Sequence, residues 1–178
     1  MNYADIKQFD VANGPGIRVS LFVSGCTHHC KGCFNEVAWD FNYGTPFTEQ
    51  SIEQIISYLA PKHVAGLTIL GGEPFEFANQ KGLLPLVREV KKRYPEKSLW
   101  CFSGYRFDED IVGRMCQEHN ETKEFLSYID ILVDGKFELE KKNLGLRFRG
   151  SSNQRIIKVR ESLETGQVVL WEGMNSNS

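Results

Sequence analysis

Three cysteines stand close together at positions 26, 30 and 33. A [4Fe–4S] cluster is normally held by four thiolates, one on each iron, so three would leave one iron open to an exogenous molecule. With His28 or His29 as a further ligand, the same run could instead hold zinc. Structural zinc sites usually pair one C-x-x-C with a second pair, and the chain has none. The spacing alone leaves iron–sulfur, zinc and no metal open.

The two remaining cysteines have no cysteine neighbours. Cys101 follows Trp100 in an apolar run, and Cys116 falls in a predicted helix. Either could supply a fourth ligand in principle. The favoured interpretation is a small buried hydrophobic residue in both cases, because free cysteine is among the most buried residue types.

Length and composition limit the class of protein. With 178 residues, 41% hydrophobic and 25% charged, the chain predicts a single globular domain over residues 1–178, with a core at about 13–160 and a tail at 161–178 of unassigned role. A net charge of −2 gives no reason to expect a nucleic acid or an anionic membrane as partner. No apolar run approaches the ~20 residues of a membrane span, and residues 1–10 lack a secretory signal. We expect a cytoplasmic protein, where clustered cysteines indicate metal or catalysis before disulfides.

Apolar periodicity predicts alternating strands and helices. Strands are expected at 17–24, 66–70, 98–102, 129–133 and 156–159, with one more at 168–171. Helices are expected at 48–60, 79–94, 108–118 and 121–128. Residues 1–16 are expected to be irregular. Strands joined by helices predict an α/β fold with a parallel sheet. Because an eight-stranded barrel needs ~250 residues, we expect a partial, open (β/α) barrel of five or six parallel strands.

Special residues follow several of these strands. The cysteine run follows the first, Gly71-Gly72-Glu73 the second and Asp134-Gly135-Lys136 the fourth. Paired glycines expose the backbone to a ligand, and a carboxylate can accept hydrogen bonds from an ammonium group. Each motif alone is an ordinary turn or surface ion pair. At the carboxyl edge of a parallel sheet, where sites are built, they become candidates. The aromatic-rich stretch 34–44 is expected to pack beside them, and 150–155 is dense in hydrogen-bonding groups.

These motifs together resemble the radical S-adenosylmethionine (SAM) enzymes, which carry Cys-x3-Cys-x2-Cys after the first strand and Gly-Gly-Glu after the second. Gly14-Pro15-Gly16-Ile17-Arg18 and Asp134-Gly135-Lys136 resemble the subset that activates glycyl-radical enzymes. Val-Asp-Gly-Lys-Phe at 133–137 and Arg-Gly-Ser-Ser-Asn-Gln at 149–154 resemble members of that subset whose partner is the anaerobic ribonucleoside-triphosphate reductase. The resemblance covers roughly residues 1–160.

The resemblance implies a set of site residues. Cys26, Cys30 and Cys33 would each ligate one iron of a [4Fe–4S] cluster, whose fourth iron would bind the amino and carboxylate groups of SAM. The other implied SAM contacts are Gly71, Gly72 and Glu73 at the ammonium, and Asp134 and Lys136 on the carboxylate and ribose side. Activases often carry an aromatic residue just before the third cysteine, where this chain has Gly32. The adenine contact is therefore expected from the backbone of 32–34 or the Phe34 ring, with Asn35 as a further candidate.

The resemblance also implies an activity and its partners. A reduced cluster would cleave SAM to a 5′-deoxyadenosyl radical, which would remove hydrogen from a glycine of the reductase large subunit. An electron donor such as flavodoxin would be needed, whereas no nucleic acid or membrane would be involved. Two alternatives remain: a radical SAM enzyme that modifies a small molecule, and a non-catalytic zinc-binding adaptor.

Overall fold

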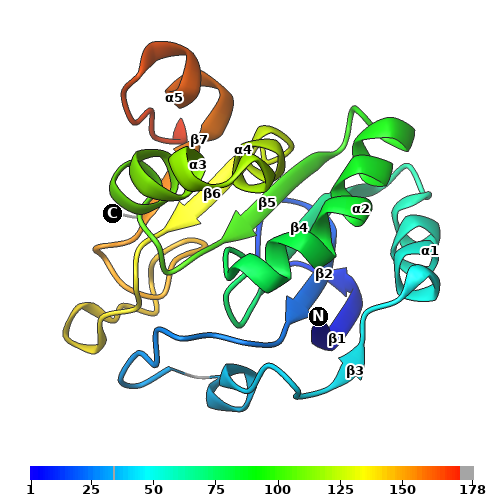
Figure 1. Cartoon of the computed structure of the whole chain (residues 1–178), viewed down its shortest axis with the longest axis horizontal. Coiled ribbons are helices and arrows are strands. Elements are labelled where there is room, and N and C mark those ends of the chain that lie inside the picture. Colours follow the sequence, from blue (N-terminus) through cyan, green and yellow to red (C-terminus); the bar gives the residue numbers. More distant parts are fainter. Residues whose placement is uncertain (34, 173–178) are drawn as a thin grey trace.

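The structure is a computed structural model that describes residues 1–33 and 35–172. It has a mixed α/β fold around a seven-stranded sheet with the strand order β3-β1-β2-β4-β5-β6-β7 (Figure 1). The strands are β1 Asn2–Asp10, β2 Ile17–Val23, β3 Thr45–Pro46, β4 Val64–Gly71, β5 Ser98–Phe102, β6 Ile131–Asp134 and β7 Arg155–Lys158. The helices and helical turns are η1 Glu36–Trp39, α1 Glu49–Leu59, α2 Phe77–Arg93, η2 Phe107–Met115, α3 Cys116–Glu118, α4 Asn120–Ser127, η3 Leu139–Lys141 and α5 Val159–Thr165.

The centre of the sheet is parallel and its flanks are antiparallel. Strands β2, β4, β5 and β6 pair in parallel, as the sequence predicts. Strand β7 runs antiparallel to β6, so the prediction that all strands are parallel is wrong there. A parallel neighbour needs a crossover, usually a helix. Between β6 and β7 the chain contains only the short η3 turn, and it therefore re-enters the sheet in the opposite direction.

Strand β1 corrects the expectation that residues 1–16 are irregular. It pairs antiparallel with β2 and, at its start, with the two-residue β3. All its side chains except that of Asp10 are half-buried or exposed, so no apolar alternation marks it in the sequence. Pairing with β2, and the packing of Tyr3 and Ile6 against the core, hold it in place.

Three further differences concern helices and the C-terminal region. The predicted helix at 108–118 is π-helical over Phe107–Met115. Val159, predicted to end a strand, begins α5 instead. The expected strand at 168–171 is reduced to one bridge between Leu170 and Ile157. Among the described residues, no helix is long and apolar enough to cross a membrane.

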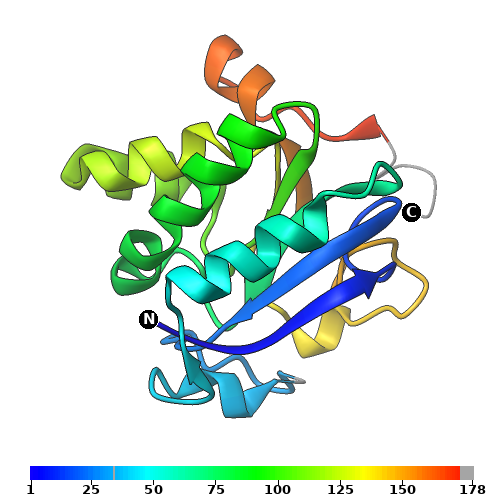
Figure 2. The ribbon, with the colours of Figure 1, turned by 90° about the vertical axis from the view of Figure 1, so that its right-hand side faces the viewer.

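The two faces of the sheet are covered differently. Helices pack on one face over a large apolar core that includes Cys101 and Cys116, confirming the buried interpretation of both cysteines. Trp100 faces the other way, into a smaller cluster with Phe148 and Trp171. In Figure 2 the helices lie on one side of the sheet, and the segment between β6 and β7 lies on the other.

Arg18, from the Gly-Pro-Gly-Ile-Arg motif, is fully buried on this second face. Its guanidinium donates hydrogen bonds to the carbonyl oxygens of Leu67 and Ser98 and to the hydroxyl of Thr68. Burial lowers its pKa to about 10, because the charged form loses water. The side chain ties β2 to β4 and β5, so the motif arginine supports the sheet.

Candidate active site

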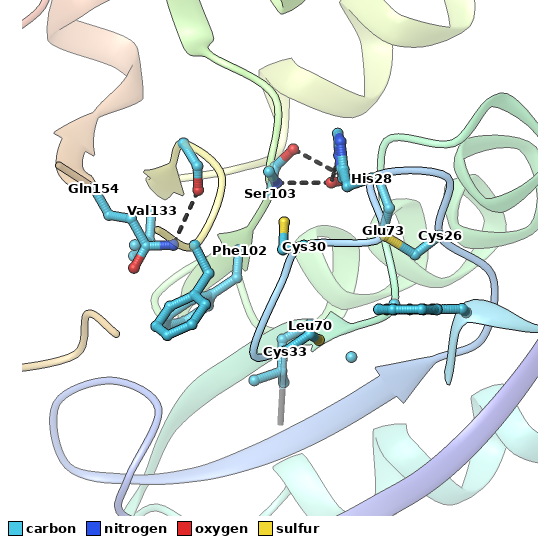
Figure 3. A pocket seen from close by; sticks show the side chains of 16 residues that line it. Cys26, His28, Cys30, Cys33, Leu70, Glu73, Phe102, Ser103, Val133 and Gln154 are labelled. Atoms are coloured by element: carbon cyan, nitrogen blue, oxygen red, sulfur yellow. Dashed lines mark hydrogen bonds and ion pairs between the residues drawn. The ribbon is translucent and has the colours of Figure 1, made fainter. Parts of the chain in front are cut away.

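The loops after β2, β4, β5 and β6 meet at the carboxyl edge of the parallel strands and line one cavity (Figure 3). Its lining comprises Cys26, His28, Cys30, Cys33, Trp39, Leu70, Gly71, Gly72, Glu73, Phe102, Ser103, Gly104, Val133, Gly135, Phe137 and Gln154. The tertiary structure therefore brings the cysteine run and the Gly-Gly-Glu motif together. This is the edge at which open α/β sheets bind ligands.

The three cysteines stand around the same cavity. Cys26 is buried, and Cys30 and Cys33 are half-buried. Burial raises the pKa of Cys26 to about 11 and also raises the pKa of Cys30, because a thiolate is poorly solvated there. Metal ligation requires the thiolate, so a bound cation must replace these protons. Within the described chain, no three potential ligands gather around one point.

The η1 turn that follows the cysteine loop forms backbone hydrogen bonds with it. The amide of Gly25 donates to the carbonyl of Ala38 at 2.7 Å, and the amide of Cys26 donates to that of Trp39 at 3.2 Å. Trp39 lines the cavity and stacks on His29, with ring centroids 4.3 Å apart. The expectation that 34–44 packs beside the cysteines is thus confirmed for Ala38 and Trp39. Phe34 lies outside the described residues.

Close backbone approach explains the two glycines at the end of β4, Gly71 and Gly72. The amide of Gly72 donates to the carbonyl of Val23 at 2.8 Å, and the amide of Glu73 donates to that of Gly25 at 2.7 Å. A Cβ on Gly72 would lie 2.6 Å from the Gly25 carbonyl oxygen, closer than atoms can pack. The motif therefore holds the cysteine loop against β4 through backbone contacts that side chains would prevent.

The Glu73 carboxylate is fully buried and binds four donors. One oxygen accepts from the amide of Gly104 and from Nε2 of His28, each at 2.7 Å. The other accepts from the amide of Phe75 and the hydroxyl of Ser103, each at 2.8 Å. A carboxylate offers about four acceptor sites. Glu73 thus joins the loops after β2, β4 and β5.

His28 has a role that the sequence did not indicate. Its ring donates to Glu73 and meets the Tyr105 ring edge-on, with centroids 4.4 Å apart. A Cβ on Gly104 would lie 2.6 Å from the His28 ring, so this glycine makes room for it. The sequence raised His28 only as a zinc ligand, since a partner 45 residues away leaves no local signal.

Four of the predicted residues that the structure describes lie outside the cavity lining: Gly32, Asn35, Asp134 and Lys136. The buried carboxylate of Asp134 accepts hydrogen bonds from the Arg155 guanidinium, the nearer at 2.6 Å, and from the amide of Phe107 at 2.7 Å. The hydrogen bonds of Arg155 with Asp134 and with Asp108 raise its pKa. Lys136 is exposed. The neighbours Gly135 and Phe137 line the cavity instead.

Side chains of the hydrogen-bonding run at 150–155 bind the backbone of the loop after β6. The side-chain amide of Gln154 donates to the Gly135 carbonyl at 2.9 Å and accepts from the Gly150 amide at 2.8 Å. Asn153 donates to the Lys136 carbonyl at 2.8 Å. The run therefore fixes the backbone of the loop after β6, and Gln154 itself reaches the cavity (Figure 3).

Gly32, where activases often have an aromatic residue, is constrained in two ways. Its φ of +78° lies in the left-handed region, and a Cβ would lie 2.9 Å from Cδ1 of Leu139. We expect Gly32→Ala to lower the free energy of unfolding by about 1–2 kcal/mol through the backbone conformation alone. Adding Leu139→Ala should remove the clash with the new Cβ, and so recover only the steric part of the lost unfolding free energy. Urea unfolding of the metal-free variants measures both effects, and a neutral Gly32→Ala would contradict this geometry.

Comparison with known proteins identifies the class and then the family. A family model described as "4Fe-4S single cluster domain" matches residues 12–157, which contain the whole cavity. The chain is therefore an iron–sulfur protein of the single-cluster class.

Relatives over most of the chain share one printed name, "Anaerobic ribonucleoside-triphosphate reductase-activating protein". The chain is 42% identical over 158 residues to that of Enterobacteria phage T4 (88% of this chain, 93% of the relative). It is 42% identical over 160 residues to that of Pasteurella multocida (89% and 98%) and 38% identical over 162 residues to that of Escherichia coli K12 (90% and 100%). The chain belongs to this family of activating proteins. The predicted resemblance is confirmed, and the iron–sulfur interpretation is favoured over zinc.

Proposed function

We propose that this protein forms a glycyl radical on the large subunit of an anaerobic ribonucleoside-triphosphate reductase, using SAM cleaved at a [4Fe–4S] cluster. One observation carries the proposal: Cys26, Cys30 and Cys33 line a single cavity beside Gly71 and Gly72. The other two cysteines are buried in the core under the helices. Three thiols for four irons leave one iron for SAM. The names of the relatives support the reductase as the target.

The chain supplies binding, orientation and exclusion of water. When bound, the cluster provides the electron for reductive cleavage of the C5′–S bond of SAM. In this proposal Gly71 and Gly72 present backbone to the SAM ammonium, and Lys136 provides a cation for its carboxylate. The ion pair between Asp134 and Arg155 holds the end of β6, and so positions Gly135, the next residue. The adenine contact is proposed to come from the backbone of 32–34 or from the Phe34 ring, with Asn35 as a further candidate. Apolar walls from Leu70, Phe102, Val133 and Phe137 keep the site dry.

The proposed chemistry also gives the fold a role. We propose that the central parallel strands act as a partial, open barrel within one domain, whose open side admits a glycine loop of the reductase. A low-potential donor such as flavodoxin would supply the electron, in the cytoplasm.

Anaerobic reconstitution with iron and sulfide tests the proposal. The expected result is a brown protein that cleaves SAM to methionine and 5′-deoxyadenosine under dithionite, and a glycyl radical by electron paramagnetic resonance once reductase is added. Purified protein with zinc but without iron or sulfide would support the adaptor alternative. SAM cleavage without a radical on the reductase would support an enzyme acting on a small molecule.

A further inference from the structure

The 138–149 loop, which follows the cavity residue Phe137, stands beside the cysteine loop. Its η3 turn packs Leu139 against Gly32, between the second and third cysteines of the run. The loop lies on the sheet face opposite the helices (Figure 2). A protein that bound this loop would therefore be placed next to the cavity.

The tip of the 138–149 loop is held rigidly. Lys142 forms a β-bridge with Ser151, and the amide of Asn143 donates to the Gly150 carbonyl at 3.2 Å. Across the tip, the amide of Gly145 donates to Oδ1 of Asn143 at 2.9 Å. A preorganised loop loses little conformational entropy on binding. Leu144 lies between Asn143 and Gly145, so hydrogen bonds hold the backbone on both sides of it.

Leu144 is 91% exposed, the highest exposure among the large hydrophobic residues that the structure describes. A single exposed leucine is ordinary on a protein surface. This one stands at a hydrogen-bonded loop tip, and the same loop carries a second exposed leucine, Leu139, which is 42% exposed and lies against Gly32 of the cysteine loop. Side chains that fill desolvated pockets near the centre of a protein–protein interface carry most of its binding energy.

The same loop is basic in a chain of net charge −2. It carries Lys141, Lys142, Arg147 and Arg149 against two glutamates. In the described part of the chain, Lys142 and Arg147 form no ion pair, whereas Lys141 pairs with Glu138 at 3.6 Å. The Arg147 guanidinium lies over the rings of Phe148 and Trp171, at 4.9 and 5.6 Å from their centroids. Two oriented cations beside an apolar anchor fit an acidic surface with an apolar pocket.

We propose that the 138–149 loop is the docking site for the reductase, with Leu144 entering an apolar pocket and Lys142 and Arg147 pairing with carboxylates around it. The inference rests on the proposed function. The anchor favours the reductase over the electron donor, because electron-transfer encounters are small and weak. Docking next to Gly32 also brings the partner chain to the mouth of the cavity.

The test measures the affinity of the reconstituted full-length protein for the reductase by anaerobic calorimetry. Leu144→Asp is expected to weaken binding at least about 30-fold, as for an anchor residue. Lys142→Glu with Arg147→Glu should weaken it at least about tenfold and flatten its salt dependence. The matched controls are Leu163→Asp on α5, where the leucine is 45% exposed, and Lys92→Glu on α2; both should bind like wild type.

Two further measurements separate this inference from the proposed function. Dithionite-driven SAM cleavage without reductase should be unchanged in Leu144→Asp and in the charge variant, since neither touches the cavity lining. If wild type itself fails that assay, the proposed function fails instead. Wild-type affinity for the reductase in both variants would overturn the docking site. So would a loss confined to cluster reduction by flavodoxin, which would assign the loop to the electron donor.

Discussion

Replacing Cys26, Cys30 or Cys33 singly with alanine is expected to abolish both the brown chromophore and SAM cleavage. In the proposed cluster each thiolate would hold a separate iron, so no neighbouring cysteine could take over the lost bond. Burial raises the pKa of Cys26 to about 11, so at neutral pH this thiol gives up its proton only when a metal replaces it. Iron and acid-labile sulfide content after anaerobic reconstitution, together with 5′-deoxyadenosine formation, measures the loss.

Cys101→Ala and Cys116→Ala are the matched controls. Both side chains are buried under the helices and lie outside the cavity, so both variants should keep full iron and sulfide. A chromophore that survives Cys26→Ala but disappears with Cys101→Ala would overturn the ligand assignment. A wild-type protein that holds zinc without sulfide, and loses it on joint replacement of His28 and His29 by alanine, would restore the zinc adaptor.

Glu73→Gln is expected to lower the free energy of unfolding of the metal-free protein by about 2 kcal/mol or more, and to impair cluster retention. Either placement of the glutamine amide sets an N–H group against the amide of Phe75 or that of Gly104, neither of which can turn away. Each buried donor left without an acceptor costs about 1–3 kcal/mol. Urea unfolding gives the stability, and iron content after anaerobic desalting shows whether the three loops still hold together.

Glu76→Gln is the control for Glu73. One oxygen of Glu76 accepts from the amide and the hydroxyl of Thr27, at 3.1 and 2.6 Å. The side chain is only half-buried, so a glutamine can keep its carbonyl toward Thr27 while water meets its amide. We expect a cost below about 1 kcal/mol and normal iron content. Equal behaviour of the two variants would contradict the central role of Glu73.

Local patterns are enough to predict the centre of the fold. Short apolar stretches indicate β4, β5 and β6, because a strand buried on both faces is apolar throughout. Strand β2 is indicated by an alternation of apolar and polar residues that becomes apolar toward its end. Parallel strands end at a common edge, and this rule alone predicts that the cysteine run lies beside Gly71 and Gly72. The same reasoning cannot predict β1, whose half-buried and exposed side chains leave no apolar alternation.

The sequence by itself determined which residue types gather at the carboxyl edge, and hence the class of chemistry. The tertiary structure alone decided how their side chains are used. Glu73 meets His28 and Ser103, which are 45 and 30 residues away, and Asp134 meets Arg155 across an antiparallel pair. Such contacts depend on strand register, strand direction and loop packing, which no local pattern records. For this reason the three-cysteine run, taken together with the motifs after the later strands, predicts which residues would hold the cluster, whereas the hydrogen bonds around them emerge only from the fold.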